Sequence, residues 1–217
     1  MENPWRKLPD REPFVLEQDR PFVEQHNAKA KPEHFIHTKL LPEPFLGNPD
    51  APVVLLNLNP GYNEKDLDSQ DARFTELSQD NRLHRGGSHP FYLLNPEIEN
   101  SLAYQWWDSR LRELIKVCGR ECVAQNVFAV EMMPYHSAKY KPLVVPSQAY
   151  SFELVRRAIQ RRAVIVQMFG KNEWPKCFPE LLEHQHYYRV NGRGVYVTPR
   201  SCPEGFPAIV ETLKRHA

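Results

Sequence analysis

The chain has 217 residues, a length typical of one domain with a full hydrophobic core. It carries 28 lysines and arginines against 27 aspartates and glutamates, so its balanced charge excludes a polycation that coats nucleic acid. No apolar run reaches the roughly 18 residues of a membrane-spanning helix, and the first residues lack the apolar segment of a secretory signal. We therefore expect a cytoplasmic protein with no membrane partner, whose cysteines are reduced.

Prolines punctuate the N-terminal segment. The chain has 20 prolines, almost twice the usual share, and many of them lie before residue 50. Residues 17–29 predict a helix that carries Pro21 in its first turn, where proline is tolerated. The rest of this segment has too few apolar residues for a core of its own. We expect residues 1–45 to form an arm packed on a single domain of residues 46–217.

Apolar runs predict the strands of that domain. Val53–Leu56 is continuously apolar, which is typical of a strand buried on both faces of a parallel sheet. Residues 126–132 and 163–169 predict the second and third strands in the same way. Residues 187–190 and 194–197 flank a glycine-rich turn and predict a hairpin.

Helical patterns lie between the strands. An amphipathic helix is expected over residues 103–117, with Gly119 at its C-terminal cap and the Trp106–Trp107 pair placing one indole in the core and one outside. Further helices are expected over residues 66–83, 147–161 and 207–215, with a short one around Pro175. Alternating strands and helices predict an α/β fold, a three-layer α/β/α sandwich with a mainly parallel central sheet.

Polar residues follow each predicted strand. Ligands of open parallel sheets bind beyond the carboxyl ends of the strands, so we expect these residues to converge on one cleft. The sequence has no glycine-rich phosphate-binding motif, and its cysteines and histidines show no ligand spacing for a metal, so neither a cofactor nor a metal is expected. The candidates are Asn57, Asn59, Gly61 and Tyr62, then Glu131, Tyr135 and His136, then Lys171, and finally Thr198, Arg200 and Ser201.

Four segments carry a resemblance to a known family. Asn57-Leu58-Asn59-Pro60-Gly61 resembles motif I of the uracil-DNA glycosylase superfamily, and is most similar to the mismatch-specific uracil/thymine type. Residues 126–131 stand where the family's second core strand ends. Residues 164–174, VIVQMFGKNEW, resemble its apolar strand followed by a glycine at a helix start. Residues 197–203, VTPRSCP, resemble its late motif II before the last helix. The segments occur in the family's order across roughly residues 40–215.

The resemblance implies a uracil-DNA glycosylase-like fold and a DNA base-excision hydrolase. Such an enzyme extrudes one altered base into a pocket and cleaves its N-glycosidic bond, largely through electrostatic stabilisation. Asn59 takes the role of positioning the water, and Thr198 stands where the family opens motif II with His or Asn. His136 is then expected to orient the base or stabilise the leaving anion.

The remaining candidates are assigned by their place in the pattern. Phe91 and Tyr92 are expected to stack on the base, and Asn57, Gly61, Tyr62, Glu131 and Tyr135 to line the pocket. Lys139, Lys171, Arg200 and Ser201 are expected to contact DNA, and the protein is expected to be a monomer. Each has a simpler interpretation: a tight turn for Asn59-Pro60-Gly61, core anchors for Phe91 and Tyr92, a local hydrogen bond for His136, and an ion pair for Glu131.

Two departures from the family leave other functions open. Thr198 supplies no imidazole, and Glu131 meets the carbonyl oxygens of uracil favourably only when it is protonated. One alternative is a catalytically inactive member of the same fold that binds DNA or a nucleobase. The other is an enzyme that acts on a free nucleoside or nucleobase, which the near-neutral charge favours.

Overall fold

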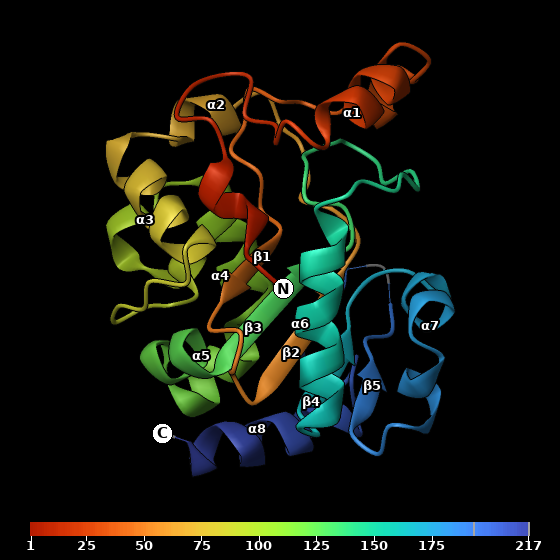
Figure 1. Cartoon of the computed structure of the whole chain (residues 1–217). Helices are drawn as coiled ribbons and strands as arrows, with labels where there is room; N and C mark the ends of the chain where they lie inside the picture. Colours follow the sequence, from red (N-terminus) through yellow and green to blue (C-terminus); the bar gives the residue numbers. More distant parts are fainter. Residues whose placement is uncertain (193, 217) are drawn as a thin grey trace.

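A five-stranded sheet forms the centre of the computed structural model, which describes residues 1–192 and 194–216 (Figure 1). The strands lie in the order β1-β3-β2-β4-β5. Four of them are parallel, and β1 at one edge runs antiparallel to β3. The strands are β1 (Phe45–Gly47), β2 (Val53–Asn57), β3 (Val127–Glu131), β4 (Val164–Gln167) and β5 (Tyr187–Arg189).

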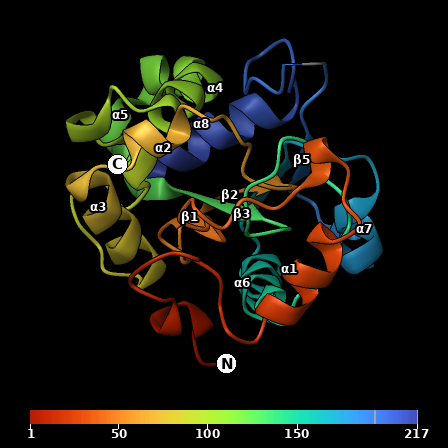
Figure 2. The same cartoon turned by 90° about the horizontal axis from the view of Figure 1, so that it is seen from above.

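Helices cover both faces of the sheet (Figure 2). One layer contains α3 (Ala72–Arg82), α4 (Leu102–Cys118), α5 (Arg120–Asn126) and α8 (Gly205–Arg215). The other contains α1 (Arg20–Asn27), α6 (Gln148–Gln160) and α7 (Glu173–Cys177). Within the described part of the chain, no helix combines the length and the apolar character needed to cross a membrane. The short elements are α2 (Asp66–Ser69) and the 3-10 turns Pro4–Lys7, Pro32–His34, Tyr92–Leu94, Pro96–Ile98 and Pro179–Glu183.

The central strand β2 shows why the sheet is sandwiched. Val53 and Leu55 face the cluster of α4, α5 and α8, whereas Val54 and Leu56 face the cluster of α6 and α7. All four side chains are fully buried, because successive residues of a strand point to opposite faces. The expected α/β class with a mainly parallel sheet between two helical layers is confirmed.

Three local expectations differ from the structure. Residues 120–126 form the helix α5, so the second strand begins one residue later than the apolar pattern indicates. Residues 195–197 form no strand, because Val195 and Val197 pack into the core and the amide N of Val197 donates to the carbonyl of Arg110. Arg193, in the predicted turn, lies outside the described residues. The boundary expected after residue 45 falls inside β1.

The N-terminal segment is built into the core and into the edge of the sheet. Trp5, Val15 and Val23 are buried in the cluster that also contains residues of β2 and α6. The residues that precede β1 run alongside the end of β3. There the amide N of Glu43 donates to the carbonyl of Pro134, and His37 forms a backbone bridge with His136. This places residues 37–43 beside the carboxyl end of the sheet.

Candidate functional site

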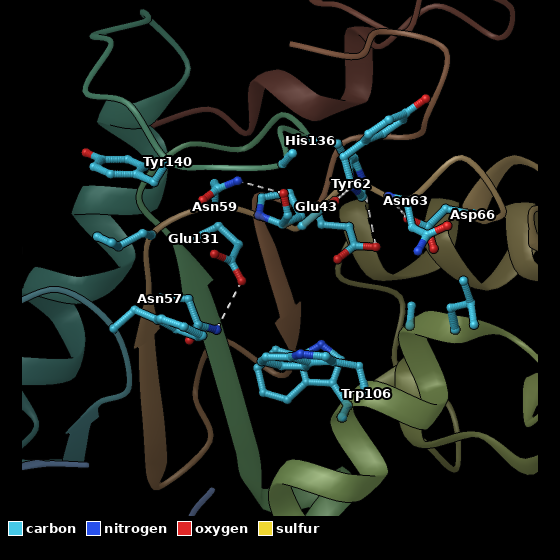
Figure 3. A pocket seen from close by; sticks show the side chains of 18 of the residues that line it. Glu43, Asn57, Asn59, Tyr62, Asn63, Asp66, Trp106, Glu131, His136 and Tyr140 are labelled. Carbon is cyan, nitrogen blue, oxygen red and sulfur yellow. Dashed lines mark hydrogen bonds and ion pairs between the residues drawn. The ribbon is translucent and has the colours of Figure 1, made fainter. Parts of the chain in front are cut away.

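A cavity of about 750 Å³ opens at the carboxyl ends of β2 and β3 (Figure 3). Its walls come from the turn after β2, the loop after β3, the start of α4, the residue Phe169 after β4 and Glu43 of the N-terminal segment. This is the edge at which parallel sheets bind their ligands. The lining residues that carry chemistry are Glu43, Asn57, Asn59, Tyr62, Asp66, Trp106, Glu131, His136, Lys139 and Tyr140.

Asn57 and Glu131 form a polar pair at the base of the site. They are register partners on neighbouring parallel strands, and Nδ2 of Asn57 donates to Oε1 of Glu131 at 3.0 Å. The other oxygens, Oδ1 of Asn57 and Oε2 of Glu131, are buried without a hydrogen-bond partner in the described structure. Burial, and secondly the nearby charge of Glu43, raises the pKa of Glu131 well above its ordinary value. Glu131 is therefore a neutral carboxylic acid with one O–H to donate.

Asn59 stands at the rim, where the chain leaves β2. Its Nδ2 donates to the carbonyl of Pro60 at 2.8 Å and to the carbonyl of Ser137 at 2.9 Å. These bonds hold the turn after β2 against the loop after β3. Both of these hydrogen bonds use Nδ2, so Oδ1 is the side-chain atom that remains to accept a hydrogen bond from a ligand or a water.

His136 is fixed by hydrogen bonds at both ring nitrogens. Nδ1 lies 2.6 Å from the carbonyl oxygen of Gly61, and Nε2 lies 2.9 Å from that of Leu41. Both partners are backbone carbonyl oxygens, so both ring nitrogens are occupied by main-chain acceptors. The ring lines the cavity and braces three segments, but neither nitrogen is free to orient a base as the sequence led us to expect.

The side-chain oxygens of the buried Glu43 make no hydrogen bond to any residue that the structure describes. Its side chain is 7% exposed, and Oε1 lies 4.0 Å from Nε2 of His136. Burial raises the pKa of Glu43, and the charges of His136 and Arg82 oppose that rise. Asp66 contributes a further carboxylate, whose Oδ2 accepts from the amide N of Asn63 at 2.7 Å and whose pKa is also raised by burial.

Aromatic rings form an apolar wall across from these polar groups. The indole of Trp106 projects from α4 toward the cavity, and it stacks with Phe169 at a centroid distance of 6.3 Å (Figure 3). Trp107, the neighbour of Trp106, is buried in the core beneath it. Tyr62 also lines the cavity, and its ring stacks face to face on His37. Such a wall suits a flat heterocycle.

Three predicted pocket residues lie elsewhere. Phe91 and Tyr92 are buried in the core, where Phe91 packs edge-on against Trp107 and Tyr92 against Phe74, so the expectation that they stack on a ligand is wrong. The hydroxyl of Tyr135 donates to Oδ2 of Asp19 on the opposite side of the loop. From the sequence, an aromatic residue in a loop can equally well pack in the core or line a cavity. Only its packing partners in the folded protein distinguish these two roles.

The segment after β5 does not reach the cavity. Thr198 and Ser201 bond to each other, since the amide N of each residue donates to the side-chain oxygen of the other at 3.1 Å. This local turn precedes α8, and Arg200 is exposed beside it. Lys171 is exposed and outside the lining, so of the four expected DNA-contacting residues only Lys139 lies at the cavity.

Four lining residues, Glu43, Asp66, Trp106 and Tyr140, were not among the candidates that the sequence indicated. Glu43 stands between two prolines, a sign of a restrained backbone, but nothing local connects it with β3. Trp106 was recognised only as one member of a pair. Across the described ranges, no three His, Cys, Asp or Glu side chains gather to hold a metal ion.

Comparisons with family models, with curated proteins and with solved structures find no match for this chain. The resemblance of residues 57–61 to a glycosylase motif therefore rests on the sequence itself.

Proposed function

We propose that the cavity binds a nucleobase and that the protein hydrolyses an N-glycosidic bond, as a uracil-DNA glycosylase-like enzyme. One observation carries the proposal: the motif-like residues Asn57 and Asn59 meet Glu131 in a cavity that is walled by the indole of Trp106 (Figure 3). In this arrangement the amides can form hydrogen bonds with the edge of a base, and the aromatic ring can stack on its face.

The unpartnered oxygens at the base of the cavity support a polar ligand edge. Oδ1 of Asn57 accepts a hydrogen bond, and the protonated carboxyl of Glu131 donates one. A buried polar atom without a partner costs free energy until one is supplied. A base edge that carries an N–H beside a carbonyl oxygen supplies both partners, and uracil, thymine, hypoxanthine and guanine carry that edge.

The charge of the lining favours a second candidate substrate. Among the lining residues Lys139 is the single lysine and there is no arginine, whereas Glu43 and Asp66 add carboxyl groups beside the neutral Glu131. A DNA strand needs cations for its phosphates, whereas a free nucleoside needs none. The cavity volume of about 750 Å³ also exceeds that of a single base and accommodates the attached sugar. Hydrolysis of a free nucleoside is therefore the alternative to excision from DNA.

A release assay distinguishes these functions. The protein is incubated with single- and double-stranded oligonucleotides that each carry one altered base, and separately with free nucleosides, and the released base is quantified by chromatography. We expect release from at least one substrate, and its loss in Asn59→Ala but not in the exposed control Asn191→Ala. Absence of release from every substrate, together with nucleobase-induced thermal shifts, would leave the catalytically inactive, base-binding alternative.

Binding itself is tested at the aromatic wall. Removal of the indole in Trp106→Ala should weaken nucleobase binding by roughly tenfold or more, because base–aromatic stacking contributes about 1–3 kcal/mol. Titration calorimetry with free nucleobases measures this directly. Phe22→Ala removes an exposed aromatic ring that is not part of the lining, and it serves as the control. Equal affinities of Trp106→Ala and wild type would argue against the proposed binding mode.

A further inference from the structure

We infer that Glu43, contributed by the N-terminal segment, is the general base that activates water in this cavity, and that Glu131 is the acid that protonates the leaving base. The inference rests on the proposed hydrolysis and extends it to a residue outside the motif-like segments. It assigns the two proton-transfer roles to two carboxyl groups from different parts of the chain.

The backbone holds Glu43 beside the end of β3. Its own amide N donates to the carbonyl of Pro134 at 2.9 Å, and the amide N of Glu131 donates to the carbonyl of Pro44 at 3.1 Å. Pro42 and Pro44 flank the residue and restrict its backbone further. Glu43 and Glu131 are therefore fixed relative to each other by main-chain hydrogen bonds, and both line the same cavity (Figure 3).

The oxygens of Glu43 are available to a water molecule. No hydrogen bond within the described chain engages them, and the ring nitrogens of His136 are directed at backbone carbonyls instead. Of the other carboxyl groups, Asp66 accepts from the amide N of Asn63, and Glu131 is protonated. Asn59 has an amide, which orients a water but does not take its proton. Glu43 is thus the lining carboxylate suited to that task.

The surroundings of Glu43 and Glu131 differ in charge, so the two carboxyl groups differ in how readily they ionise. His136 and Arg82 are the cations near Glu43, whereas Asp66 and the neutral hydroxyl of Tyr92 are its other titratable neighbours. Within the described ranges no cation acts on Glu131, which instead faces the charge of Glu43. Glu43 therefore ionises first and Glu131 keeps its proton, which is the division expected of a base and an acid in one hydrolytic site.

The proposed step replaces the bond between C1′ and the base by a bond between C1′ and a water oxygen. The oxygen of water attacks the sugar carbon C1′ while a carboxylate oxygen of Glu43 takes one proton from that water. The bond between C1′ and the base nitrogen breaks, and its electron pair goes to the base. Glu131 delivers its proton to the base, and the products are the free base and a sugar with a hydroxyl group at C1′. Proton transfer from solvent to Glu131 and from Glu43 to solvent restores the site.

The test uses the full-length protein and the best substrate of the release assay. Glu43→Gln, Glu43→Asp and the exposed control Glu64→Gln are compared with wild type in single-turnover hydrolysis and in nucleobase binding. We expect Glu43→Gln to lower the rate constant of hydrolysis by about 10²- to 10⁴-fold with little change in nucleobase affinity, and Glu43→Asp to be intermediate. The rate of wild type should fall at low pH as Glu43 is protonated, and Glu43→Gln should lack this limb.

Each outcome bears on a different claim. Wild-type hydrolysis that survives Glu43→Gln unchanged, with the same pH profile, overturns the assignment of Glu43 and leaves the proposed function standing. A wild-type protein that binds nucleobases but hydrolyses nothing removes the proposed hydrolysis, and the roles of both carboxyl groups fall with it. Loss of nucleobase binding in Glu43→Gln, with an unchanged melting temperature, contradicts the general-base role and identifies Glu43 as a binding group.

Discussion

The amide of Asn57 donates to the carboxyl of Glu131 across two neighbouring parallel strands, at 3.0 Å, and each side chain keeps one buried oxygen that has no partner among residues 1–192 and 194–216. The strands bring the two residues into register, because Asn57 is the last residue of β2 and Glu131 the last of β3. A polar pair is thus set at the point where the sheet ends and the cavity begins.

The first prediction concerns the pH dependence of stability through Glu131. Its pKa is raised by burial, so above the ordinary value of 4.5 the folded state binds more protons than the unfolded state. The free energy of unfolding should therefore fall as pH rises above 4.5. Glu131→Gln should flatten this fall, because a glutamine side chain binds no proton over this range. Urea unfolding at several pH values measures the difference, and parallel curves for both proteins would contradict it.

A second prediction concerns His84, which titrates in the opposite sense. Its pKa is lowered from 6.5 to about 4, chiefly by burial against Phe45, so the unfolded state binds the proton first as pH falls. The stability contributed by the neutral ring is full above pH 6.5 and is lost as pH falls toward 4. Allowing for its partial exposure, we expect a loss of about 1–2 kcal/mol. This loss should be absent in His84→Gln and present in the exposed control His216→Gln.

A third prediction concerns the hydrogen bond from Tyr135 to Asp19. Tyr135→Phe leaves Oδ2 of the fully buried Asp19 without its donor at 2.7 Å, and the amide N of Leu16 without its acceptor. We expect a loss of about 1–3 kcal/mol, or roughly 2–4 °C in melting temperature per kcal/mol. Tyr188→Phe is the matched control, and calorimetry is the measurement. Nucleobase affinity should stay unchanged, and a selective loss of binding would return Tyr135 to the site.

Much of the fold follows from local patterns. Val53–Leu56 is continuously apolar because both faces of β2 are covered, and Gly119 ends α4 with a φ of +87° that glycine adopts without strain. The helix α5 and the missing strand after residue 194 escaped these patterns. In both places the pattern is short, and packing against the core decided the conformation.

The positions of Asn57, Asn59, Glu131 and His136 near one cavity were accessible from the order of residues, because parallel strands end at the same edge of a sheet. The inclusion of Glu43 and Trp106, the burial of Phe91 and the distance of Thr198 depended on contacts between segments far apart in the chain. Periodicity reports which face of an element is apolar, but the partner that covers that face is chosen by the packing of the whole molecule.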